Sequence, residues 1–249
     1  MGPRCMLLIV ILLIASVQAE VSFIKHDQVQ PFPQLKPTTN SERIAINCKP
    51  LLYIERGCYP YPAVNVNGSL NGGLEWGGAE NGDCKGSKLG SQVYSRSASF
   101  RNKWAIMYAW YFPKSINFIS TMISGQRHFW KFVIVWIDDP NKENSTMLGV
   151  STPAYTKFLK KTPPKSKFVD GSSIKLRSDV SFWGSTGVLK FTTTRGELQN
   201  LITWEQLTDE ARDSLSEFEL NVNAIEQKHA QVPFTDNVFR KHLEAGWPF

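Results

Sequence analysis

The feature that most constrains the fold is a long apolar stretch over residues 104–138. It contains two runs, residues 104–112 (WAIMYAWYF) and 132–138 (FVIVWID), which are rich in Val, Ile, Trp, Tyr and Phe. Each run is as long as a strand and apolar on both faces, so we expect two strands in the centre of a sandwich core. A short polar segment, residues 125–131 (GQRHFWK), lies between them. Whatever function the fold supports is expected to depend on what this segment presents.

The last third of the chain has the pattern of helices. Thr208 precedes two acidic residues, as an N-cap does, and residues 207, 211, 215 and 218 are apolar at helical spacing. A second helix is predicted from Asp236, as its cap, to about Gly246. Because strand patterns come first in the sequence and helix patterns come late, we predict an α+β fold. In this fold a central β-sandwich carries peripheral helices, two of them near the C-terminus.

The N-terminus has the layout of a secretory signal peptide. Arg4 is followed by an apolar run over residues 6–15 and by small residues before Glu20, which predicts a signal over residues 1–19 cleaved between Ala19 and Glu20. A transmembrane anchor is the alternative, but a bilayer needs roughly 20 apolar residues. Loss of Arg4 lowers the formal net charge from +6 to +5. We therefore expect a secreted, extracellular monomer.

Residues 20–42 contain three prolines among polar residues, and we expect an extended or disordered leader there. A short alternating run at residues 43–46 is compatible with a first strand. The remaining residues, 43–249, suit one domain with a single core.

Three cysteines, Cys48, Cys58 and Cys84, remain after removal of the signal. An odd number leaves one unpaired in an oxidising compartment. Cys58 and Cys84 lie at the two ends of a glycine-rich segment, and a bridge between them would stabilise the fold by roughly 3 kcal/mol. A bridge from Cys48 to Cys84 is the alternative. Asn67 and Asn144 begin sequons and are possible glycosylation sites.

No arrangement of residues predicts an enzyme. The chain contains no Gly-x-Ser-x-Gly elbow, no zinc-type histidine spacing and no Cys-x-x-Cys. Adjacent Asp138 and Asp139 would point to opposite faces of an extended chain. A positive net charge and five lysines within residues 157–167 instead favour anionic surfaces, such as acidic polysaccharide or lipid headgroups. We expect no nucleic-acid partner and no stable membrane insertion.

Residues 105–114 (AIMYAWYFPK), followed by residues 125–131, resemble the signature of the necrosis- and ethylene-inducing peptide-like proteins, which plant-associated fungi, oomycetes and bacteria secrete. Further similar segments are residues 57–65 (GCYPYPAVN), 84–87 (CKGS), 135–138 (VWID) and 232–234 (VPF), so the resemblance spans about residues 44–247. It implies an actinoporin-like β-sandwich and supports the Cys58 to Cys84 bridge. The retained motif residues are Gly125, Arg127, His128 and Trp130.

Toxic members of this family damage plant plasma membranes by binding sphingolipid headgroups with the help of a divalent cation. Their heptapeptide is Gly-His-Arg-His-Asp-Trp-Glu, and an Asp precedes it just after the Trp-Tyr-Phe-Pro-Lys run. Here the corresponding positions hold Ser115 for that Asp, Gln126 for the first His, Phe129 for the second Asp, Lys131 for the Glu and, in a looser alignment, Gly187 for a later His.

These replacements make the local charge more positive by four. A lysine ammonium about 5 Å from a dication would repel it by roughly 7 kcal/mol at an effective dielectric constant near 20. Hard divalent cations also require several oxygen ligands. We therefore expect no bound cation and no other cofactor; a displaced site at Asp138, Asp139 or Glu143 is the alternative.

The resemblance thus implies a secreted, non-cytolytic effector in the host apoplast, with a plant cell-surface receptor or an anionic glycan or lipid headgroup as its partner. It also implies that some plants perceive one segment as a microbial pattern, whose residues here are Ala105, Ile106, Met107, Tyr108, Trp110, Tyr111 and Phe112. One alternative is a plasma-membrane cytolysin that causes necrosis. Another is a polysaccharide-binding module, for which Trp76 in the glycine-rich loop would be an exposed platform.

Overall fold

The computed structural model describes residues 22–119, 122–154, 157–182, 188–221 and 231–249. The predicted signal peptide with its Ala19–Glu20 cleavage site and the loosely aligned Gly187 lie outside the described residues. None of the helices in the described ranges is long and apolar enough to cross a membrane.

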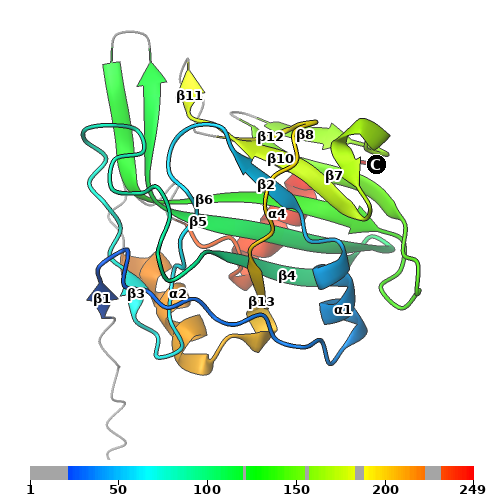
Figure 1. The fold of residues 1–249 in the computed structure, drawn as a ribbon. Coiled ribbons are helices and arrows are strands. Elements are labelled where there is room, and N and C mark those ends of the chain that lie inside the picture. The colour runs from blue at the N-terminus through cyan, green and yellow to red at the C-terminus, as the bar shows by residue number, and fades with distance from the viewer. Residues whose placement is uncertain (1–21, 120–121, 155–156, 183–187, 222–230) are drawn as a thin grey trace, which may run out of the picture.

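A large seven-stranded sheet is built around the two apolar runs (Figure 1). The strand order is β13-β4-β5-β6-β7-β8, and β11 pairs with β5. The strands are β4 (Gln92–Phe100), β5 (Lys103–Ile119), β6 (Met122–Ile137), β7 (Met147–Ala154), β8 (Lys157–Lys161), β11 (Ser181–Phe182) and β13 (Asn200–Thr203). Residues 105–112 and 132–137 are all buried, which confirms the prediction of two central strands.

A second sheet of four strands has the order β12-β10-β2, with β9 paired to β10. Its strands are β2 (Leu51–Ile54), β9 (Val169–Asp170), β10 (Ser173–Ser178) and β12 (Leu189–Phe191). A separate parallel pair joins β1 (Phe23–Ile24) to β3 (Leu70–Asn71). Apolar residues of the second sheet, including Leu52, Ile174 and Leu176, share one buried cluster with β5 and β6. The two sheets therefore enclose one core, as predicted for a sandwich.

The α-helices lie at the periphery (Figure 1). In the described ranges they are α1 (Asn40–Asn47), α2 (Asp209–Asn221) and α4 (Asp236–Gly246), and short 3₁₀ turns there are η1 (Ser166–Phe168) and η2 (Trp204–Gln206). Gly246 of α4 lies close to Ile134 of β6, whereas Lys131 of the same strand reaches Ser178 of β10. Odd and even residues of a strand point to opposite faces, so α4 and the second sheet cover opposite faces of β6. The α+β prediction is confirmed.

Both C-terminal helices form where their sequence pattern predicts. Residues 207, 211, 215 and 218 are all buried, and the Thr208 hydroxyl accepts a hydrogen bond from the Ala211 amide. In α4 the N-cap residue is Thr235, and Asp236 is instead the first helical residue.

The strand predicted at residues 43–46 is wrong, and the expected leader is partly packed against the domain. Residues 43–46 belong to α1, whose start is fixed by a capping box between Thr39 and Glu42. Within the expected leader, Val29 and Phe32 are buried, and the Phe32 amide donates to the side chain of Gln92. This part of the expected leader therefore packs against the domain.

Two polar segments of the sequence contain strands. The polar segment at residues 125–131 is part of β6, where it pairs with β5. The lysine-rich segment contains β8, and Lys160 donates a hydrogen bond to the carbonyl of Trp247. In both places a paired neighbour from elsewhere in the chain satisfies the backbone, and this overrides a polar local sequence.

Candidate functional site

The β5–β6 hairpin brings the replaced ligand positions close together. Ser115 lies opposite Gln126, and Phe112 lies opposite Phe129. Lys131 is two residues beyond Phe129 in β6, so both side chains leave the same face of the strand. That face is directed toward the second sheet, because the Lys131 ammonium reaches β10.

The ammonium of Lys131 is held inside the protein. It donates hydrogen bonds to Ser178 Oγ at 2.8 Å and to the carbonyl oxygen of Asp179 at 3.1 Å. The side chain is only 8% exposed. Burial lowers the pKa of Lys131 to about 7, an effect that the charge of Asp179 opposes and that of Lys190 reinforces. A lysine amine that changes its charge near pH 7 is thus part of the core at this position.

Aromatic rings complete the surroundings of this ammonium. Lys131 Nζ lies 4.9 Å from the ring centroid of Phe112 and 5.9 Å from that of Phe129. Both distances suit a cation–π interaction. The cavity beside it, which Cys58, Glu80 and Ser115 help to line, has only about 10 Å³ of free space, roughly the room of one water molecule.

This set of side chains does not fit the divalent cation that the family resemblance implies. The four positions provide a hydroxyl, an amide, a phenyl ring and an ammonium, whereas Ca²⁺ and Mg²⁺ need several oxygen ligands. Across the described ranges there is no group of three or more His, Cys, Asp or Glu residues that could hold a metal ion. The ammonium occupies the position from which a family carboxylate would be expected to bind.

The alternative carboxylates at residues 138–143 serve a turn. Asp138 pairs with Lys142 and accepts a hydrogen bond from the Thr146 amide. Asp139 accepts hydrogen bonds from the backbone and side chain of Asn141. These contacts close the connection between β6 and β7, and residues 138–143 contain no group of three or more His, Cys, Asp or Glu residues that could hold a metal ion.

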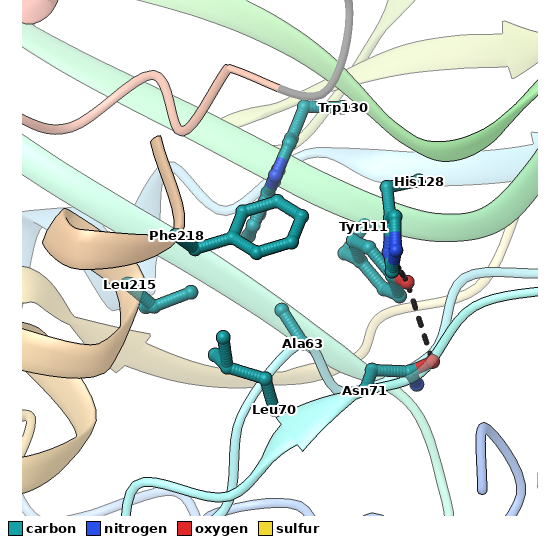
Figure 2. A pocket seen from close by; sticks show the side chains of 8 residues that line it. All are labelled: Ala63, Leu70, Asn71, Tyr111, His128, Trp130, Leu215 and Phe218. Atoms are coloured by element: carbon teal, nitrogen blue, oxygen red, sulfur yellow. Dashed lines mark hydrogen bonds between the residues drawn. The ribbon is translucent and has the colours of Figure 1, made fainter. Parts of the chain in front are cut away.

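The retained motif residues have packing roles. His128 is 6% exposed, and its Nδ1 atom lies 2.7 Å from the hydroxyl of Tyr111, which donates to Asn71 Oδ1 at 3.2 Å (Figure 2). Its ring lies 4.9 Å from that of Phe218 in α2. Burial, reinforced by Arg127, lowers the pKa of His128 to about 4. His128 therefore joins β6 to β3 and α2 as a neutral core residue.

Its neighbours in the motif also support the structure. Arg127 pairs with Glu75 and donates to the carbonyl of Gly72, while the Trp130 ring packs edge-on against Tyr111. Gly125 allows a close approach, since a Cβ atom there would lie 2.6 Å from the Cβ of Trp76. The motif residues that this chain retains are thus the ones whose side chains, or lack of one at Gly125, the packing requires.

The remaining predicted positions are placed as follows. Cys58 and Cys84 form a disulfide, as favoured, and Cys48 is free and buried. Asn67 and Asn144 are exposed, and Trp76 is 38% exposed.

Sequence analysis missed the partners of Lys131 and His128, which are Ser178, Asp179, Asn71 and Phe218. They lie far away in the chain, and no local pattern marks them.

The buried His128 and the partly buried His242 make acid sensitivity a testable consequence. Burial lowers the pKa of both His128 and His242 to about 4, against roughly 6.5 in an unfolded chain. Between these values the unfolded state binds more protons, so the free energy of unfolding should fall as the pH falls from 6.5 to 4. At pH 4.5 each histidine should cost about 2.5 kcal/mol relative to pH 7.5.

Guanidinium unfolding at several pH values measures this loss. His242→Phe, which removes one titrating ring beside Phe132, should abolish about half of the pH dependence. An equal pH dependence in the parent protein and this variant would contradict the assignment.

The model of the family described as Necrosis inducing protein (NPP1) matches residues 42–246. The NLP effector protein Pc118548 of Phytophthora capsici is 48% identical over 250 residues, with all of both chains covered. Among solved structures, the non-toxic HaNLP3 protein has a TM-score of 0.80 and 40% identity over 90% of this chain and 99% of its own.

NLPPya is a second structural neighbour, with 34% identity over 91% of this chain and 99% of its own. Its structures were determined in complex with mannosamine and with glucosamine, with TM-scores of 0.78 and 0.77.

Proposed function

The chain belongs to the necrosis-inducing protein (NPP1) family and to its NLP effectors, and from this premise we propose that it is a non-cytolytic effector, secreted to act at the plant cell surface. In this proposal it works as a monomer by binding, without catalysis, and without a resident divalent cation. Its place of action is the host apoplast.

The observation that carries this proposal is the buried ammonium of Lys131. It lies at the position where a cation-binding family member is expected to have a carboxylate. Its hydrogen bonds go to Ser178 and Asp179 inside the protein, so this position offers no ligand to a cation. A dication next to this ammonium would be repelled by several kcal/mol. Similarity to HaNLP3, a protein described as non-toxic, supports the same conclusion.

Perception as a microbial pattern would require processing. The segment from Ala105 to Phe112 is 0–2% exposed in the centre of the sandwich. A receptor could therefore bind this segment only as a released peptide. Recognition of the folded protein must use other surfaces.

A glycan is the partner that we favour for the folded protein, above a protein receptor or a lipid headgroup. The related NLPPya was crystallised with mannosamine and with glucosamine. The part-exposed ring of Trp76 offers the kind of apolar face on which sugars stack. We therefore include binding of amino-sugar-containing glycans in the proposed function.

Calorimetric titration of the mature protein with Ca²⁺ and with Mg²⁺ tests the closed cation site. We expect no binding in the micromolar to low millimolar range, because the site offers an ammonium in place of carboxylates. A toxic relative, titrated under the same conditions, is the positive control. Micromolar binding by this chain would refute the closed-site proposal.

Infiltration of the purified protein into leaves of broad-leaved plants separates the effector from the cytolysin. We expect no lesion at doses where a toxic relative, prepared in the same way, causes necrosis. The unfolding transition of both samples should be recorded first, so that loss of fold is not mistaken for lack of toxicity. A lesion of comparable size would favour the cytolysin.

A further inference from the structure

Two buried lysines line one small cavity beside the β5–β6 hairpin. Lys114 of β5 is 4% exposed and Lys131 of β6 is 8% exposed. Both line the cavity of about 10 Å³ that lies at the replaced ligand positions, and Ser115 lines it with them. Such a space admits one particle of about the size of a water molecule. What the cavity can bind therefore depends on two ammonium groups.

Each of the two ammonium groups has a donor to spare. A lysine ammonium carries three N–H donors and no acceptor. Lys131 uses two of them, toward Ser178 Oγ and the carbonyl oxygen of Asp179. Lys114 also uses two, toward carbonyl oxygens of the glycine-rich loop at 3.1 and 3.4 Å. One donor of each lysine is thus without a hydrogen bond to another residue in the described ranges.

Neither ammonium forms an ion pair with a carboxylate in the part of the chain that the structure describes. The carboxylates nearby are engaged with other cations. Both oxygens of Glu80, which lines the cavity, accept hydrogen bonds from Arg56. Asp179 pairs with Lys190 at 3.6 Å and acts on Lys131 only from a longer distance. Two buried positive charges therefore remain, and a buried charge without a counter-ion is costly.

We propose that this cavity binds one small monovalent anion of about the size of chloride, held between Lys114 and Lys131. The proposal goes beyond the proposed function and rests on its closed cation site. The remaining N–H donor of each lysine would point to the ion, and so would the hydroxyl of Ser115, which has no hydrogen bond to another described residue. Chloride is only slightly larger than a water molecule, whereas sulfate and phosphate exceed the space.

An anion at this place would join three parts of the fold. Lys131 connects β6 to Ser178 of β10, and Lys114 connects β5 to Ala79 of the glycine-rich loop. Burial lowers the pKa of Lys131 to about 7, and a neighbouring anion favours the charged form of the amine. This part of the fold would thus hold an ion of opposite charge to the cation that the family resemblance implies.

Urea unfolding at pH 6 in sodium chloride and in sodium gluconate, at equal ionic strength, tests the anion site. Urea adds no anion, and gluconate is too large for the cavity. We expect the ratio of folded to unfolded protein to rise about fivefold as about 200 mM chloride replaces gluconate, which by mass action corresponds to a dissociation constant of about 50 mM. No gain in chloride would overturn the proposal, because water would then suit the cavity equally well.

Matched variants locate the effect. Lys131→Met and Lys114→Met each remove one donor and one charge from the cavity, so each should lose the stabilisation by chloride. Lys157→Met removes an exposed charge in β8, outside the cavity lining, and should retain it. The readout is the difference between the two salts for each protein, so the basal stability of a variant cancels. An equal chloride effect in all four proteins would mean unspecific attraction of anions and would contradict the site.

A crystal soaked in sodium bromide gives the position of the ion directly, because bromide scatters anomalously. We expect a peak between Lys114 Nζ and Lys131 Nζ. A peak that lies only on the surface, or that persists in crystals of Lys131→Met, would identify an adventitious ion only and would overturn the proposal.

The outcomes for the anion are distinct from those for the cation. With chloride held constant, the Ca²⁺ titration reports cation binding alone. Failure of the anion proposal would leave the closed cation site intact, whereas micromolar Ca²⁺ binding would refute the closed site whatever the effect of chloride.

Discussion

Lys131→Glu is expected to lower the free energy of unfolding by about 3–5 kcal/mol, the usual cost of an uncompensated buried charge. In the parent protein the ammonium donates to Ser178 Oγ and to the carbonyl of Asp179, and it faces two phenyl rings. A carboxylate would face that carbonyl oxygen and the negative faces of the rings. Guanidinium unfolding at pH 6, below the pKa of about 7 for Lys131, measures the difference.

Lys131→Met is the matched control, because it keeps the length of the side chain and removes its charge. Replacing a buried charged group by an apolar one of similar size is often neutral or stabilising. We expect this variant to retain at least most of the parent stability. If both variants lost the same free energy, the shape of the side chain would explain the loss and the charge would not.

Cys58→Ser with Cys84→Ser is expected to cost about 3 kcal/mol, within the range of 2–5 kcal/mol for loss of a native disulfide. The two cysteines are 26 residues apart and both are buried. Their bridge removes conformational freedom from the unfolded chain. Guanidinium unfolding without reductant measures the effect.

Cys48→Ala is the control for this pair. Cys48 is buried and free, so its replacement removes a small apolar group and should cost only about 1 kcal/mol. A loss as large as that of the double variant would mean that packing of sulfur atoms, and not the bridge, determines stability here.

The geometry explains why some motif residues persist beside replaced ligand positions. Gly125 is in close contact with Trp76, and His128 joins Tyr111, Asn71 and α2. These contacts hold the sandwich and its loops together whether or not a cation is bound. The replaced positions, in contrast, are those whose family side chains would bind the cation. They can be substituted together where the Lys131 ammonium occupies the space of that cation.

Much of the fold could be predicted because its signals are local. The two apolar runs are buried strands, and Thr208 starts a helix whose apolar face is buried. Helix α1 contradicts the strand predicted at residues 43–46, because the capping box of Thr39 and Glu42, which is also a local signal, starts a helix there. The polar residues 125–131 were expected outside the strands, but pairing with β5 decided their conformation.

By itself, the sequence determined the family signature, the central strands and the loss of the ligand set, since each depends on the identity and spacing of residues close together in the chain. Only the tertiary structure decided which groups the Lys131 amine hydrogen-bonds to, what His128 contacts and which cysteines pair. Ser178 lies 47 residues from Lys131, and Asn71 lies 40 residues from Tyr111. Contacts over such separations depend on how the sheets and loops pack, so they become visible only in the folded protein.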